Sequence, residues 1–482
     1  MRKKFATNLI FLFAANLLVK PFWIFGIDRV VQNRVGPEVY GTYFAVFNYS
    51  FLLSVLLDFG INNFNNRAVS RNNQRAGEYL LNLTVLKIFL GFLYFTFTFL
   101  SALSTGYSEL QMKMLLFLAL NQILLSAILY FRSNIAALQL FKTDSVLSVM
   151  DRLLTIGFCS VLMYSSLAKD SFNILWFIYA QTLALFITAL IAGWIIAGKT
   201  VLKLTFWKFK FAKLILLKSM PFALLALLMG IYYRIDAVMI ERMLPNGAHE
   251  AGVYAASFRL LDALNMFGYL FATLLLPMFA GMIRRKEKVN ELVKFSSELM
   301  FVMAIVGGVS CYFFRTEIMA LLYRDSNTYW AKIFGWLMLN FIPMSCIYIF
   351  GTLLTAKGSL KILNLIALGG VMINVALNLF LIPGYGAFGA TIATLITQLF
   401  AAIVHIITAS KQFNLKFELK DVLRLTVFVL FCVAAFSLIK MLPLHWLLNF
   451  LLSTMACFVI AMLAGFFPIQ QFFSLLKSKN AS

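Results

Sequence analysis

Charged residues are scarce in this chain of 482 residues: Asp, Glu, Lys and Arg make up 12% of it, whereas 62% is hydrophobic. A soluble globular protein carries about 25% charged residues, because its surface must be hydrated. The composition therefore excludes an ordinary soluble enzyme. Since one transmembrane helix takes about 20 apolar residues, the hydrophobic content suffices for roughly 14 spans. The sequence predicts an all-α polytopic membrane protein.

Cysteine and histidine are also rare, with five and three residues, and no CxxC pair occurs. Neither a disulfide framework nor a zinc site is indicated, and we expect no cofactor, no metal and no enzymatic activity. Residues Gly193 to Thr200 match the phosphate-loop pattern GxxxxGK[ST]. That loop requires a preceding strand and a following helix. Here the match ends an apolar span, so it is interpreted as a helix end with an interfacial lysine.

Fourteen apolar segments are long enough to cross a bilayer. They lie at about 8–33, 41–66, 79–103, 111–137, 144–167, 172–197, 212–241, 250–281, 295–314, 328–356, 360–382, 387–409, 421–441 and 446–468. The first follows a basic start, as in a signal peptide, but Lys20 and Pro21 interrupt it and no small-residue cleavage site is clear. We therefore expect it to be retained as a membrane helix.

The basic residues are distributed unequally between the two sides of the membrane. One set of loops, which includes both termini, carries 26 Lys and Arg, with residues near span ends counted in the adjoining loop, and the opposite set carries 8. Because Lys and Arg collect in cytoplasmic loops, both termini are predicted to be cytoplasmic. The net charge of +22 is thereby explained by topology, and nucleic acid is not an expected partner. The basic loops are expected to contact anionic lipid headgroups.

Two segments repeat each other in the same orientation. Ile27-Asp28-Arg29-Val30, followed by Pro37, Gly41 and Tyr43, parallels Ile235-Asp236-Ala237-Val238, followed by Pro245, Gly252 and Tyr254. The repeat predicts two six-helix bundles, residues 1–205 and 206–410, and two additional C-terminal helices in residues 411–482. Parallel repeats of this kind are one plan of membrane transporters, with substrate bound between the halves.

Charges inside the predicted spans mark the candidate site. Each costs at least about 2.5–3.5 kcal/mol at mid-bilayer unless it is paired or hydrated. The cations are Lys20, Arg29, Lys87, Arg132, Arg152, Arg234 and Arg259, and the acids are Asp28, Asp58, Asp151, Asp236 and Asp262. Asp58 precedes Asn62 by four residues, and Arg259 precedes Asp262 by three, so each pair shares a helix face. Some of these charges could form interhelical ion pairs. As a set they favour a hydrated cavity that binds an anion, because cations outnumber acids.

Three motifs resemble a known family. They are Asn33-Arg34-Val35-Gly36-Pro37-Glu38-Val39-Tyr40-Gly41-Thr42-Tyr43 followed by Asp58-Phe59-Gly60, then Arg234-Ile235-Asp236-Ala237-Val238 leading to Ala251-Gly252-Val253-Tyr254, and Gly384-Tyr385-Gly386-Ala387-Phe388-Gly389-Ala390. In this order, and with 14 spans, the chain resembles the Wzx-type polysaccharide flippases of the multidrug/oligosaccharidyl-lipid/polysaccharide exporter superfamily.

The resemblance implies a V-shaped pair of bundles that work by alternating access in a bacterial inner membrane. The implied substrate is an oligosaccharide on undecaprenyl pyrophosphate, moved from the cytoplasmic to the outer leaflet. The cations would bind the pyrophosphate, and outward movement of an anion gains about 2.3 kcal/mol per charge per 100 mV. The five acids are candidates for charge pairing or for coupling to H⁺ or Na⁺. Membrane lipids and glycan polymerase or assembly proteins are the other expected partners.

Alternative functions remain open at this point. A cation-coupled multidrug exporter of the same superfamily should have an acidic cavity, which the excess of cations disfavours. A flippase for the peptidoglycan precursor would use the same chemistry on another glycan. A membrane-embedded glycan polymerase or ligase should carry large outer loops, and a simple channel would not need paired charges in two bundles.

Overall fold

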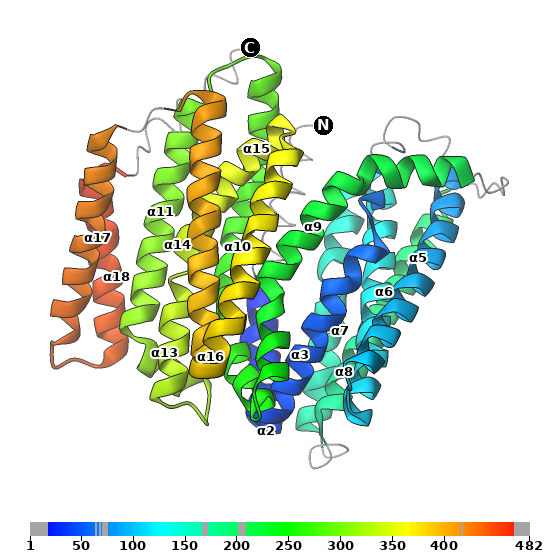
Figure 1. The fold of residues 1–482 in the computed structure, drawn as a ribbon, viewed down its shortest axis with the longest axis horizontal. Coiled ribbons are helices and arrows are strands. Elements are labelled where there is room, and N and C mark those ends of the chain that lie inside the picture. Colours follow the sequence, from blue (N-terminus) through cyan, green and yellow to red (C-terminus); the bar gives the residue numbers. More distant parts are fainter. Residues whose placement is uncertain are drawn as a thin grey trace. The chain divides into compact units, whose positions relative to one another are not determined.

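A computed structural model describes residues 18–62, 65–66, 69, 76–165, 172–200, 209–415 and 418–466 (Figure 1). These residues form helices and connecting turns, with no strand among them. The predicted all-α class is confirmed. The chain divides into two compact units, Met1–Ala255 and Ala256–Ser482, and each is described by itself. The bundle boundaries at 205 and 410 stay predictions.

The described residues of the first unit form α-helices together with one π-helical and one 3-10 turn. They are η1 (Trp23–Asp28), α2 (Arg29–Val35), α3 (Pro37–Leu53), η2 (Ser54–Leu57), α5 (Ala76–Ser104), α6 (Glu109–Ala137), α7 (Phe141–Tyr164), α8 (Ile174–Ala197), α9 (Phe209–Met243) and the first turns of α10 (Gly247–Arg284). η1 is a stretch of π-helix, whose extra residue per turn changes the direction of the side chains around it. Such turns are frequent at functional sites.

The second unit contains the rest of α10 and the following helices. These are α11 (Asn290–Phe313), α12 (Arg315–Leu322), α13 (Thr328–Met338), α14 (Phe341–Cys346), η4 (Ile347–Gly351), α15 (Thr352–Lys357), α16 (Leu360–Phe413), α17 (Leu419–Lys440) and α18 (Trp446–Leu463). Residues 328–357 run as one apolar segment through α13 to α15, so the short helices form a single irregular span.

Twelve segments of the described chain are long and apolar enough to cross a membrane. They correspond to the predicted spans with two differences. The first predicted span begins outside the described residues. The second difference is α16, which has 54 residues and would measure about 81 Å as one helix, against about 30 Å for the bilayer core.

α16 therefore contains two spans, as the sequence predicts at 360–382 and 387–409. Gly386 has φ 60° and ψ −141°, a conformation that interrupts the helix and that glycine adopts without strain. The two halves lie side by side in Figure 1, and the Phe400 ring lies 3.2 Å from where a Cβ on Gly369 would stand. The break at Gly386 thus lies between the two predicted spans.

The last two helices, α17 and α18, pack on α11. Phe428, Cys432 and Phe436 of α17 join a buried apolar cluster with Val302 and Val306 of α11. Ion pairs add to the packing: Lys294–Asp421 (2.9 Å) and Arg424–Glu298 (3.2 Å) join α17 to α11, and Lys440–Glu317 (2.8 Å) joins α17 to α12. The additional helices are consequently attached to the second unit by both apolar and charged contacts.

Candidate functional site in the first unit

Three of the predicted cations lie close together in the first unit. Lys20 is within electrostatic range of Arg152, Asp151 and Arg132. Asp144 accepts a hydrogen bond from Nε of Arg132 at 2.7 Å. We call Lys20, Arg132, Asp144, Asp151 and Arg152 the cationic cluster; three cations and two carboxylates give it a net charge of +1. Lys20 precedes η1, and the cluster joins this part of the chain to α6 and α7, which are far from it in sequence.

The cationic cluster keeps N–H groups available for an anion. Nε of Arg152 lies 3.5 Å from Oδ2 of Asp151, and its guanidinium lies over the Trp23 ring, 4.4 Å from the centroid. About a third of the Arg152 side chain is exposed. Among the described residues Lys20 has no hydrogen-bond partner. An ammonium and a guanidinium next to an aromatic ring are suited to bind phosphate oxygens.

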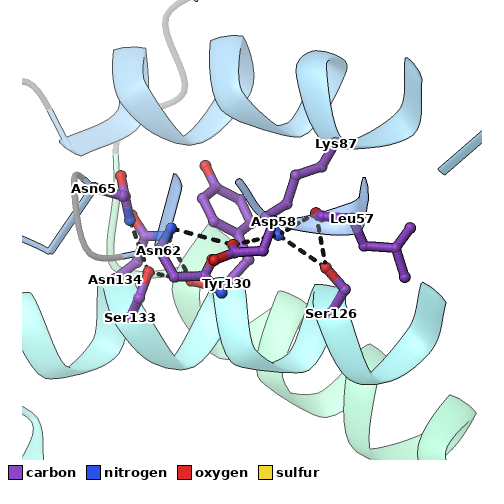
Figure 2. A network of polar contacts seen from close by, with 9 residues as sticks. All are labelled: Leu57, Asp58, Asn62, Asn65, Lys87, Ser126, Tyr130, Ser133 and Asn134. Atoms are coloured by element: carbon purple, nitrogen blue, oxygen red, sulfur yellow. Dashed lines mark hydrogen bonds and ion pairs between the residues drawn. The ribbon is translucent and has the colours of Figure 1, made fainter. Parts of the chain in front are cut away.

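Lys87 and Asp58 form a second polar centre, at the place where the second span is interrupted. The helix ends at Leu57, and Phe59 and Gly60 have φ of 42° and 78°. The Lys87 ammonium donates to Oδ1 of Asp58 (3.1 Å), the carbonyl of Leu57 (3.1 Å) and Oγ of Ser126 (2.9 Å). All three donors of the ammonium are thus used, and its side chain is 9% exposed. Figure 2 shows these contacts converging from three helical segments.

The polar centre continues along α6 toward its C-terminal end. Lys87 lies 5.6 Å from the centroid of the Tyr130 ring. The Tyr130 hydroxyl donates to the carbonyl of Leu80 (2.9 Å), and Asn65 donates to Oγ of Ser133 (2.9 Å). The backbone N–H of Asn62 donates to Oδ1 of Asp58 (3.3 Å). The two residues lie at the interruption of the span and not on the continuous helix that the sequence predicts.

The two repeated aspartates lie in equivalent surroundings. Asp28 is 2% exposed and accepts from the Tyr40 hydroxyl at 2.6 Å; Asp236 is 1% exposed and accepts from the Tyr254 hydroxyl at 2.8 Å. The repeat aligns Tyr254 with Tyr43. In the first copy, however, the hydroxyl that donates to the aspartate belongs to Tyr40, one turn before Tyr43. Both carboxylates connect one helix to the first turns of a following helix.

The remaining predicted residues are more dispersed. Nε of Arg29 is buried and has no hydrogen-bond partner in the described structure. Arg234 lies over the Phe51 ring, 5.0 Å from its centroid, and donates a long hydrogen bond to Asn48 (3.4 Å). In the second unit, Arg259 is 6% exposed, and Asp262 follows it one turn later on α10. Whether these residues contact substrate stays a prediction.

A sequence profile of the family described as "Polysaccharide biosynthesis protein" matches residues 5–283, more than half of the chain. The chain belongs to this family. The Lipid III flippase of Escherichia coli is 26% identical over 183 residues, which cover 37% of this chain and 43% of that protein. An uncharacterized membrane protein of Methanocaldococcus jannaschii is 26% identical over 185 residues, 38% and 43% of the two chains. This chain thus matches less than half the length of these curated relatives.

The fold of this polysaccharide biosynthesis family member is shared with solved transporters. Lipid II flippase MurJ in an inward closed conformation superimposes with a TM-score of 0.70 at 15% identity, covering 94% of this chain and 98% of that one. A multidrug resistance MATE family transporter in an inward-facing conformation gives 0.65 at 15% identity, covering 84% and 98%. A MOP superfamily transporter from Pyrococcus furiosus gives 0.61 at 15% identity, covering 85% and 94%. The predicted all-α transporter fold is confirmed.

Sequence reasoning missed several members of the site. Asp144, the partner of Arg132, lies in the first turn of α7, close to what the sequence suggests is a loop. Ser126, Tyr130 and Gln122 are uncharged, so a search for intramembrane charges does not find them. Their spacing of four residues along α6 is the signal that identifies a polar face. No three His, Cys, Asp or Glu side chains converge as a metal site within the described ranges.

Proposed function

We propose that this protein is a flippase that moves an oligosaccharide linked to undecaprenyl pyrophosphate from the cytoplasmic to the outer leaflet of a bacterial plasma membrane. The observation that carries the proposal is the cationic cluster, because Lys20 and Arg152 present N–H groups that suit a pyrophosphate. Family membership supports the same class of substrate. The net positive charge disfavours export of cationic drugs.

Alternating access would expose the cationic cluster first to the cytoplasm and then to the outside. On the predicted orientation, the C-terminal end of α6 and the first turns of α7 face the cytoplasm, so the cluster lies in the inner half of the membrane. A pyrophosphate arriving from the inner leaflet would meet it early, while the lipid tail stays in the bilayer. The membrane potential, negative inside, then favours outward movement by about 2.3 kcal/mol per negative charge per 100 mV.

Replacing Lys20 with glutamine tests this assignment. The ammonium makes no hydrogen bond within the described structure, so its loss leaves no protein group unpaired and folding should be unchanged. A hydrogen bond between charged groups contributes about 1.5–3 kcal/mol, which predicts an approximately 10- to 150-fold loss of substrate affinity. Arg152→Gln should behave similarly. The measurement is mass spectrometry of lipid-linked glycans in a strain whose only copy is the variant, with an added glycan-cleaving enzyme to determine the leaflet.

The matched control is Lys142→Gln, which removes the same charge from an exposed position in the first turn of α7 and should leave transport unchanged. We expect a finished repeat unit to accumulate on the cytoplasmic face in the Lys20 and Arg152 variants alone. Normal export in both of them would contradict a role of the cationic cluster. Absence of accumulation in the deletion strain itself, with altered sensitivity to cationic drugs, would favour the exporter function instead.

A further inference from the structure

A cavity of about 320 Å³ lies beside the polar centre and outside the cationic cluster. Its walls are the interrupted end of the second span (residues 51–62), the middle of α6 (residues 122–129) and α9 (residues 222–230). All of them belong to the first unit. On α9, Ala223, Ala226 and Gly230 have small side chains or none and leave the space open. The volume is within the range of about 300–1,000 Å³ that is typical of small-molecule sites.

The cavity contains polar groups that the protein itself does not use. Gln122 is 5% exposed and lines the cavity, yet its side-chain amide has no hydrogen-bond partner in the described part of the chain. Oδ1 of Asp58 is occupied by Lys87 and by the backbone of Asn62, whereas Oδ2 accepts no hydrogen bond from the described residues. A buried amide is costly unless it is paired. The arrangement therefore suits a ligand that both donates and accepts hydrogen bonds.

The cavity is electrically neutral, and part of its wall is aromatic. Among the described residues that line it, Asp58 is the single ionisable one, and Lys87 pairs with its carboxylate. Phe51, Phe59 and Phe222 supply ring surface. A phosphate would meet a carboxylate in the lining, and the Arg234 guanidinium, which lies over the Phe51 ring, is not itself among the lining residues. A cation would find Asp58 already paired. A ligand with hydroxyl groups around an apolar ring face suits this combination. Its hydroxyl groups would bind the carboxylate and the amide, and its apolar face would pack on the aromatic side chains.

We propose that this cavity binds one uncharged sugar residue of the lipid-linked glycan, with ring hydroxyls donating to Asp58 and Gln122 and the ring face against Phe222. The inference rests on the proposed function and assigns the part of the substrate that this cavity takes. Gln122 and Arg132 are ten residues apart on α6, or about 15 Å along the helix axis. A glycan whose pyrophosphate contacts the cationic cluster would reach this cavity with a sugar near its reducing end.

The test is saturation-transfer NMR on the full-length protein in detergent, with glucose, N-acetylglucosamine and glucuronate as probes and inorganic pyrophosphate as a separate phosphorus-detected probe. We expect at least one of the neutral sugars to be saturated and glucuronate to bind more weakly. Gln122→Leu should weaken binding of that sugar about tenfold and leave pyrophosphate binding unchanged. Phe222→Ala, a change of an exposed side chain on a different helix, should weaken it similarly.

The matched control is Asn121→Leu, on the same helix and equally buried. Both polar atoms of the Asn121 side chain are buried without a partner in the described structure, and the residue does not line the cavity, so sugar binding should persist. Equal loss in Asn121→Leu, retention in both cavity variants, or displacement of the sugar by pyrophosphate would overturn the proposal. Failure of the flippase function is seen separately, as normal lipid-linked glycans in the deletion strain.

Discussion

Replacing Gly252 with alanine should prevent most of the protein from folding. A Cβ at this position would stand 1.9 Å from the backbone oxygen of Pro37, and one at Gly41 would stand 1.9 Å from the backbone oxygen of Ala248. Backbone atoms at both contacts cannot rotate away as a side chain can. We therefore expect a destabilisation at or above the upper end of the about 1–3 kcal/mol that overpacking usually costs. Gly41→Ala should be equally severe.

These contacts explain why glycine recurs in the repeated motif. Gly41 and Gly252 are 211 residues apart, and so are Pro37 and Ala248, the residues they contact. The first turns of α3 and α10 thus approach each other reciprocally, each glycine admitting the backbone of the other helix. Small residues permit such close approach of helices in membranes. Any side chain at either position would separate the two backbones.

The measurement is the fraction of protein that elutes as a single species in fluorescence-detected size exclusion, together with thermal unfolding followed by a thiol-reactive dye. Such a dye is suitable because four of the five cysteines are buried. Gly157→Ala is the control: it lies within α7, and no atom stands within 4 Å of its Cβ position. Alanine there should be neutral or stabilise by up to about 1 kcal/mol. A normal yield and a normal unfolding temperature of Gly252→Ala would contradict this prediction, because α3 and α10 would then separate at no cost in stability.

The fold was largely predictable from sequence, because span number and class depend on apolar length, which the chain displays directly. The break in α16 was predictable for the same local reason, since Gly384 to Gly389 interrupt the apolar run. The pairing of Lys87 with Asp58 was not. The two residues are 29 positions apart on different spans, and apolar periodicity fixes neither the rotation of a membrane helix nor its neighbours.

Local irregularities were the second limit on prediction. The π-turn at Trp23–Asp28 and the positive φ of Phe59 change which side chains share a face, and neither has a distinctive sequence pattern. Gln122 illustrates the third limit: a buried amide without a partner becomes visible as a candidate ligand only when the surrounding cavity is known. The intramembrane charges in the sequence pointed to the region of the candidate site. Its uncharged members, such as Gln122, were found only in the structure.

Removing Lys87 should destabilise the protein more than removing any other predicted cation of the first unit. Lys87→Met leaves Asp58, the carbonyl of Leu57 and Ser126 without their shared donor. Breaking one side of a buried ion pair costs about 3–5 kcal/mol, because the remaining charge is uncompensated. Asp58→Asn should be similarly harmful, since it leaves the ammonium unpaired, although the exposure of Asp58, 35%, reduces the penalty.

The double variant Lys87→Met, Asp58→Asn separates a structural role from a binding role. With both charges absent, thermal stability should recover most of the loss, with a coupling energy of about 0.5–3 kcal/mol between the two positions. Transport should stay impaired, because the double variant still lacks the Asp58 carboxylate of the sugar cavity. If Lys87 instead binds the pyrophosphate directly, Lys87→Met alone should melt normally and lose pyrophosphate binding. That outcome would add Lys87 to the proposed pyrophosphate-binding residues Lys20 and Arg152. The interrupted second span would then be stabilised by contacts other than those of Lys87.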